Sequence, residues 1–146
     1  MFRGNAPARI DDKGRLKVPN TFRALLESKH GRELFLTSLS GEYVRIYPMP
    51  VWLGIEEKLG DIPSTHPSRL RFLDRINYFG QVGELDAQGR VLIPTRLRES
   101  ATMAGDVDVL GQFNCLDVWN HDRFLTKLQR ELYTDEDARA LSEFGI

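Results

Sequence analysis

Short stretches of alternating or continuous apolar residues, separated by glycine, proline and polar residues, predict that most of this chain forms strands and turns. The stretch 15–18 (RLKV) alternates polar and apolar residues, which is typical of a strand with one buried face. The stretch 90–93 (RVLI) is more uniformly apolar, so we expect it to be more deeply buried. Further strands are predicted over residues 8–10, 33–39, 43–47, 83–85, 107–113 and 115–119.

Proline ends two of these strands, and we expect a helix to begin after each proline. Asn20 and Thr95 follow the prolines, and both residue types are good helix N-caps. Phe22, Leu25 and Leu26 then share one face of the first of these helices. Other helices are predicted over residues 49–59, 67–80 and 122–132.

The strongest signal is an internal repeat. IDDKGRLKVP at 10–19 aligns with LDAQGRVLIP at 85–94, and aspartate, glycine, arginine and proline recur at equivalent positions. After a three-residue slip, YVRIY at 43–47 aligns with CLDVW at 115–119. The chain therefore contains two copies of one unit.

The repeat divides the chain into four parts. They are a first unit (5–59), a connecting helical segment (60–80), a second unit (81–132) and an acidic C-terminal tail (133–146). A unit of this size cannot bury much apolar surface alone. We therefore expect an α+β, β-rich chain whose two units pack as a pseudo-twofold pair with interleaved hairpins.

Each unit contains a tight Asp-x-x-Gly turn between its first two strands. Gly14 and Gly89 supply the positive φ that closes such a hairpin loop. The side chains of Asp11 and Asp86 can accept hydrogen bonds from the amides of the turn. We expect these four residues to brace the two turns.

Composition places the chain among folded proteins of a reducing compartment. The hydrophobic fraction is 41%, the charged fraction is 28%, and Cys115 is the single cysteine. No stretch approaches the ~18 apolar residues of a membrane span, and the first residues lack the apolar core of a secretory signal. We therefore expect a cytoplasmic protein without a membrane partner.

The charge is balanced overall but unevenly distributed. A net charge of −1 excludes a uniformly basic coat for nucleic acid. Residues 1–30 carry seven Lys and Arg against three acids, whereas residues 131–146 carry five acids against one Arg. Both a basic working face with an acidic solvated end and a chance distribution fit this asymmetry.

No residue pattern in the sequence indicates an enzyme active site. His30, His66 and His121 are scattered, and their spacing with Cys115 fits no metal site. Cys115 falls in a predicted strand, which indicates a buried thiol. No phosphate loop or dinucleotide fingerprint occurs, and nothing supports a small hydrolase. We expect no enzyme activity, no metal and no cofactor.

The repeated Asp-x-x-Gly-Arg turn followed by an apolar-x-apolar-Pro strand resembles the AbrB-type swapped-hairpin unit, which binds DNA. The tandem arrangement, the opening MFRG and LGQFNCLDVW at 110–119 resemble the MraZ family of bacterial transcriptional regulators, which is associated with the cell-division and cell-wall gene cluster. The resemblance covers residues 1–132. It is specific because both motif copies, their separation and the following strands fit together.

The resemblance implies a ring-forming, nucleoid-associated homo-oligomer that binds repeated short sites in double-stranded DNA at the promoter of its own operon, usually as a repressor. The family motif Asp-x-x-x-Arg matches Asp11 with Arg15 and Asp86 with Arg90. The two turns differ, because Gln88 stands where the first turn has Lys13. The DNA-binding residues are expected to be Arg15, Arg90, Lys13, Lys17, Arg3 and Arg9.

The residues alone leave alternatives open. Each motif arginine could pair bidentately with phosphate or guanine, or could form an ion pair within its turn. Arg96 and Arg98 are further candidate phosphate contacts, whereas Arg69, Arg71 and Arg75 fit a solvated helix face better. Five aromatic residues fit a protomer interface or, more simply, the core: Trp52, Phe72, Tyr78, Phe79 and Trp119. The principal alternative function is a protein-interaction module of the antitoxin type.

Overall fold

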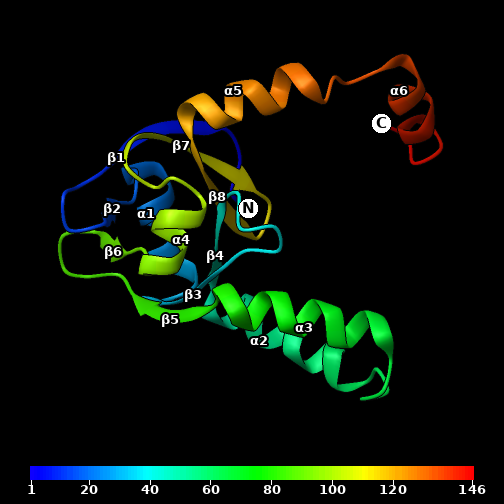
Figure 1. Ribbon diagram of the computed structural model, residues 1–146, viewed down its shortest axis with the longest axis horizontal. Helices are drawn as coiled ribbons and strands as arrows, with labels where there is room; N and C mark the ends of the chain where they lie inside the picture. The colour runs from blue at the N-terminus through cyan, green and yellow to red at the C-terminus, as the bar shows by residue number, and fades with distance from the viewer.

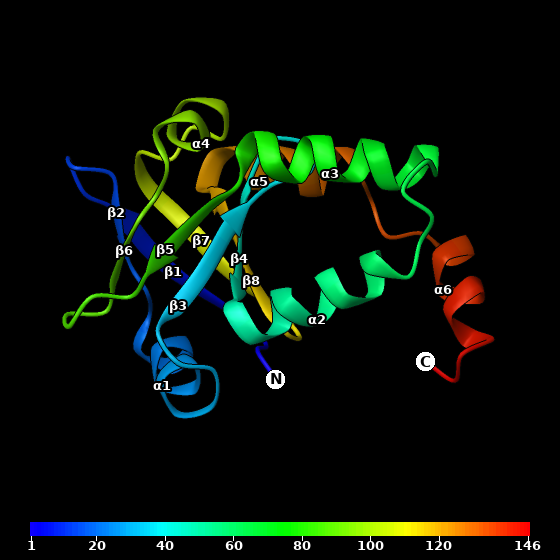
Figure 2. The same ribbon diagram turned by 90° about the horizontal axis from the view of Figure 1, so that it is seen from below.

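Eight strands form one strongly curved sheet in the computed structural model, which describes residues 1–146 (Figure 1). The strand order is β5-β3-β4-β8-β7-β1-β2-β6, and the two end strands lie beside each other, so the sheet nearly closes into a barrel (Figure 2). The fold is therefore α+β and rich in strands. In chain order the elements are β1 (Asn5–Ile10), β2 (Arg15–Lys17), α1 (Asn20–Lys29), β3 (Glu33–Thr37), β4 (Val44–Pro48), α2 (Met49–Gly60), α3 (Pro67–Phe79), β5 (Gln81–Glu84), β6 (Arg90–Leu92), α4 (Thr95–Ser100), β7 (Gly105–Gln112), β8 (Cys115–Asn120), α5 (His121–Arg130) and α6 (Asp135–Ser142).

The two repeat units exchange their first strands. β1 pairs antiparallel with β7 of the second unit, and β5 pairs antiparallel with β3 of the first unit. The two remaining pairings between units join equivalent strands, β2 with β6 and β4 with β8. These pairings between units are unchanged when the two units are interchanged, as a pseudo-twofold relation requires, whereas the β1–β2 pairing has no counterpart because β5 and β6 are the unpaired ends of the sheet.

Strand register locates where this pseudo-twofold axis crosses the sheet. In the β2–β6 pair, Leu16 lies opposite its repeat equivalent Val91. In the β4–β8 pair, Arg45 lies opposite its equivalent Asp117. The axis therefore passes through an apolar pair on one side of the barrel and an ion pair on the other.

The Arg45–Asp117 ion pair is largely buried. Arg45 Nε donates to Asp117 Oδ1 at 2.8 Å, and Arg45 Nη2 donates to Oδ2 at 3.0 Å. The Asp117 side chain is only 7% exposed, while that of Arg45 is 28% exposed. Hydrogen bonding to Asp117 raises the pKa of Arg45 despite its burial. The pair thus joins the two units by a bidentate, charge-assisted interaction.

Two apolar clusters stabilise the fold. The barrel interior is filled by side chains of both units, among them Leu16, Val91 and Leu116, and these are essentially inaccessible to solvent. A second cluster lies under α2 and α3, where the Trp52 ring stacks on Phe35 at 4.6 Å. Trp52 and Trp119 are therefore core residues of the protomer, and Cys115 is buried as expected.

Two details differ from the sequence-based expectation. Asn20 and Thr95 do not cap their helices, because the preceding Pro19 and Pro94 occupy the N-cap positions with extended ψ. The Thr95 hydroxyl instead accepts from Arg98 Nη2 at 2.9 Å. The acidic tail contains the helix α6, which a capping box between Thr134 and Asp137 stabilises at its start.

Candidate nucleic-acid interface

The aspartate of the first turn organises both the turn and its arginine. Asp11 Oδ1 accepts from the backbone N–H groups of Lys13 and Arg15, each at 2.9 Å. Asp11 Oδ2 accepts from Arg15 Nε at 2.8 Å. Gly14 has φ +80°, the left-handed conformation that a glycine adopts without steric cost. The Arg15 amide first, and then its guanidinium, lower the pKa of Asp11 below its ordinary value.

The second turn repeats this arrangement closely. Asp86 Oδ1 accepts from the amides of Gln88 and Arg90 at 2.8 Å, and Oδ2 accepts from Arg90 Nε at 3.0 Å. Gly89 has φ +77°. The pKa of Asp86 is lowered by the same groups, with the Arg90 amide as the largest cause. Sequence repetition has therefore produced two turns with one hydrogen-bond pattern.

Each turn is also held by an arginine from the helix of the other unit. Arg23 Nη2 donates to the carbonyl of Ala87 at 3.0 Å, and Arg98 Nη1 donates to the carbonyl of Lys13 at 3.4 Å. The side chain of Arg98 lies so close to Gly14 that a Cβ there would stand 2.4 Å from it. Arg98, expected from the sequence as a phosphate contact, is thus held in the first turn.

Arg23 is the structural residue that sequence reasoning missed. It packs on Gly89 as Arg98 packs on Gly14. The signal was present in the sequence, since Arg23 and Arg98 occupy equivalent positions of the repeat. What the sequence did not reveal is that each reaches across to the opposite unit.

The two motif arginines point outward from one small region. Leu16 and Val91 are buried, so the neighbouring residues Arg15, Lys17 and Arg90 lie on the outer face of the β2–β6 pair. Arg15 lies opposite Leu92, and Lys17 lies opposite Arg90. Arg15 and Arg90 are therefore diagonal neighbours, a relation that places Cα atoms about 7–8 Å apart.

Pairing with aspartate still leaves each arginine able to bind a ligand. Only Nε is bonded to the aspartate, and no protein group accepts from the Nη atoms of Arg15 or Arg90. Their side chains are 31% and 30% exposed. The free Nη pair is the end of the guanidinium that forms bidentate hydrogen bonds with phosphate or guanine. The ion pair within the turn and binding to DNA are therefore compatible.

The other predicted basic residues are unevenly placed. Lys13 is exposed in the first turn, and Arg9 and Lys17 line a shallow surface groove beside it. Arg9 also forms an exposed ion pair with Asp106 at 3.2 Å. Arg3 lies beyond the opposite end of β1, where its backbone packs on Gly111, so the structure does not bring it to the turns.

The two halves of this face differ in chemistry. Leu92, Gln88 and Glu84 occupy the repeat positions of Lys17, Lys13 and Arg9. The half formed by the first unit is therefore cationic, whereas the second unit contributes one arginine in a mainly uncharged and acidic setting.

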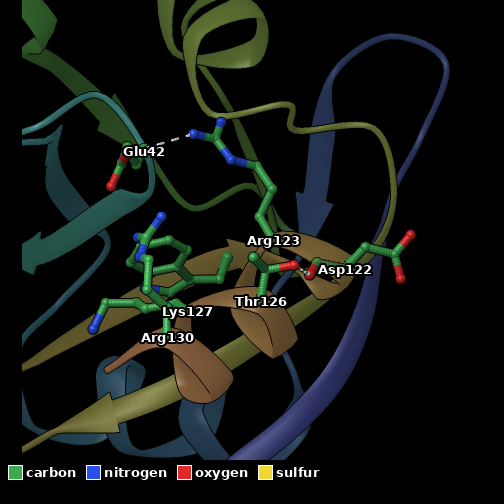
Figure 3. A pocket seen from close by; sticks show the side chains of 7 residues that line it. Glu42, Asp122, Arg123, Thr126, Lys127 and Arg130 are labelled. Carbon is green, nitrogen blue, oxygen red and sulfur yellow. Dashed lines mark hydrogen bonds and ion pairs between the residues drawn. The ribbon is translucent and has the colours of Figure 1, made fainter. Parts of the chain in front are cut away.

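A separate pocket of about 220 Å³ lies between α5 and the barrel (Figure 3). Its basic side chains are engaged with protein groups. Arg123 points toward Glu42 at 3.9 Å and donates to the Ser100 carbonyl at 2.9 Å, while Lys127 pairs with Glu131 at 3.6 Å. No group of three His, Cys, Asp or Glu residues is placed to hold a metal ion. No helix has the length and apolar character needed to cross a membrane.

Comparison with known proteins gives one consistent result. The family model described as "MraZ protein, putative antitoxin-like" matches residues 1–75 and 81–144. The chain is similar over its full length to proteins named "Transcriptional regulator MraZ", whose full length is also covered. Identity is 48% with the protein from Acidobacterium capsulatum, 46% with that from Koribacter versatilis and 32% with that from Chromobacterium violaceum.

Proposed function

Because this chain belongs to the MraZ family, we propose that it is a DNA-binding transcriptional regulator that contacts DNA through its two Asp-x-x-x-Arg turns. The shared name of its relatives supports the regulatory role. The observation that carries the assignment of the site is the outward placement of Arg15 and Arg90 as diagonal neighbours on one face. Both are aimed by rigid turns, so their guanidinium groups are preorganised for a ligand.

We further propose that the chain acts at the promoter of its own cell-division and cell-wall operon. A single protomer offers about 3–4 phosphate contacts, each contributing roughly −0.9 to the salt slope of log K. A net charge of −1 adds no general attraction to DNA. Modest single-site affinity favours a homo-oligomer, such as a ring, that reads repeated short sites. Joining sites in this way raises avidity by about 10²–10⁴-fold.

The two turns should contribute unequally. Lys13, Lys17 and Arg9 surround the first turn, whereas their equivalents around the second turn carry no positive charge. We propose that the first turn supplies most of the phosphate attraction and that Arg90 acts mainly through its own guanidinium. Repression, as is usual in the family, residence in the cytoplasm and association with the nucleoid are part of this proposal.

A salt titration with double-stranded DNA from upstream of the chain's own gene tests the site. The double variant Arg15→Ala/Arg90→Ala should bind more weakly, and the magnitude of its slope of log K against log salt should fall by about 0.9 for each phosphate that is no longer neutralised. Arg71→Ala is the matched control, because Arg71 is an exposed arginine on α3, far from the turns. Fluorescence anisotropy measures both quantities. An unchanged slope in the double variant would show that the turns do not bind the DNA.

A further inference from the structure

One exposed leucine lies on the face that carries the two motif arginines. Leu92 is 53% exposed, whereas Val91 and Ile93 on either side of it are buried in the barrel. The antiparallel register sets Leu92 directly opposite Arg15 on the outer face of the β2–β6 pair. Side chains in opposite positions of such a pair have Cβ atoms about 4.5–5.5 Å apart. Leu92 therefore lies within reach of any ligand that Arg15 binds.

The pseudo-twofold relation makes this leucine an exception on its face. The axis that crosses the β2–β6 pair exchanges the two motif arginines, and it exchanges Lys17 with Leu92. Three of the four outward side chains of the pair are cationic, and Leu92 is the fourth. A single exposed leucine is ordinary on a protein surface. This one, however, replaces the cation that the symmetry of the two units leads us to expect.

The residues around Leu92 are poor partners for phosphate and better partners for bases. Glu84 lines the same surface hollow as Leu92, and Gln88 lies in the adjoining turn. A carboxylate repels phosphate, whereas glutamate and glutamine side chains both form hydrogen bonds with base edges. The cations of the first unit are therefore the ones suited to hold the DNA backbone, and the second unit is suited to face the bases.

The β2–β6 pair matches the major groove of DNA in size. That groove is about 12 Å wide and admits a two-stranded β-ribbon. The pair lies at the end of the barrel away from the projecting helices α2 and α3 (Figure 2). The 5-methyl group of thymine is the one methyl group that the base pairs present in the major groove. A leucine on the outer face of the ribbon therefore has one base-specific apolar partner there.

We propose that Leu92 reads a thymine by packing on its 5-methyl group, and that this contact fixes which way round the protein lies on its DNA site. The inference rests on the proposed function, because it requires DNA on the β2–β6 face. A face with two identical halves would bind a site equally well in two orientations. With phosphate contacts in one half and the thymine contact in the other, only one orientation satisfies both.

Deoxyuridine in place of thymine removes only the methyl group, so it tests the Leu92 contact directly. The probe is double-stranded DNA from upstream of the chain's own gene, with its thymines replaced one at a time. Wild-type binding should weaken about fourfold at one thymine of the site, which is the effect expected for the loss of one buried methyl group. Leu92→Ala should bind the unsubstituted probe more weakly and should show no further loss at that thymine. Fluorescence anisotropy measures the affinities.

A second variant, Leu92→Lys, separates base reading from a structural role. Lys17 occupies the equivalent position of the first unit, so a strand of this kind accepts a lysine there. This variant should lose the response to deoxyuridine, while its slope of log K against log salt should steepen by about 0.9, the contribution of one more phosphate contact. Leu53→Ala is the matched control, because Leu53 is a 55% exposed leucine on α2, and it should keep the wild-type response. Circular dichroism verifies folding.

Three results would overturn the thymine contact. They are a wild type that loses no affinity at any deoxyuridine, a Leu92→Ala variant that loses as much as the wild type does, and a Leu92→Lys variant that keeps the wild-type response. Weaker binding by Leu92→Ala without any effect of deoxyuridine would place the leucine against deoxyribose instead. The salt slope of the Arg15→Ala/Arg90→Ala variant still judges the proposed function separately, and a wild type that binds no DNA would overturn both.

Discussion

The Arg45–Asp117 pair gives a quantitative test of the pseudo-twofold packing. Its two hydrogen bonds, at 2.8 and 3.0 Å, join equivalent strands of the two units where the axis crosses the sheet. Replacing one partner by leucine leaves the other as an unpaired charge. Because Asp117 is 7% exposed and Arg45 is 28% exposed, the stranded carboxylate is the worse solvated of the two.

Breaking a buried ion pair by removing one partner costs about 3–5 kcal/mol. We expect Arg45→Leu near the upper end of that range, because it strands the buried carboxylate. Asp117→Leu should lie near the lower end, because the arginine can still reach water. In a chain of this length these losses correspond to a fall in Tm of roughly 10 °C or more. The double variant, with both charges removed, should regain most of the loss.

Urea denaturation of the two single variants and the double variant measures the free energies of unfolding. Protein concentration must be held constant, because subunit association adds to apparent stability. The reasoning fails if the double variant loses the sum of the two single effects, since the two side chains would then be energetically independent.

Three further outcomes follow from the structure. Gly14→Ala should destabilise the chain by more than the roughly 1–2 kcal/mol expected for Gly31→Ala, because both have positive φ but only the Cβ at Gly14 meets a guanidinium; thermal unfolding of both variants compares them. The hydrogen bond that His121 Nδ1 donates to the Asp108 carboxylate raises the pKa of His121, so this pair stabilises the fold at acidic pH and its contribution is lost as pH rises through the raised pKa. His121→Gln should remove that pH dependence in urea titrations from about pH 5.5 to 8.5. Burial raises the pKa of Cys115 to about 11, so thiol reagents at neutral pH should react only as the protein unfolds, and fast labelling of native protein would contradict this.

The sequence predicted most of the elements and both turns, because these depend on local patterns. Gly14 and Asp11 act within five residues of each other, and the alternation around Leu16 identifies the buried face of its strand. The repeat then added a long-range expectation, the pairing of the two units. It did so because equivalent sequences adopt equivalent conformations.

The interactions between the units were beyond sequence reasoning. Nothing local indicates that Arg98 reaches the carbonyl of Lys13, or that Arg45 faces Asp117, since both depend on strand exchange. The helix does begin at Asn20, but the N-cap role expected for Asn20 was wrong, because the preceding Pro19 occupies that position. The Thr134–Asp137 capping box, by contrast, is a local sequence pattern. It could have predicted the helix α6 in the segment that its composition identified only as an acidic tail.

Strand exchange between the units also constrains how the chain matures on the ribosome. β1 is among the first segments to be synthesised, yet its partner β7 follows about 100 residues later in the chain. At roughly 5–20 residues per second, translation leaves the open edge of β1 exposed for several seconds. The nascent first unit is therefore a natural client for chaperones, and a chain truncated before β7 would be prone to aggregation.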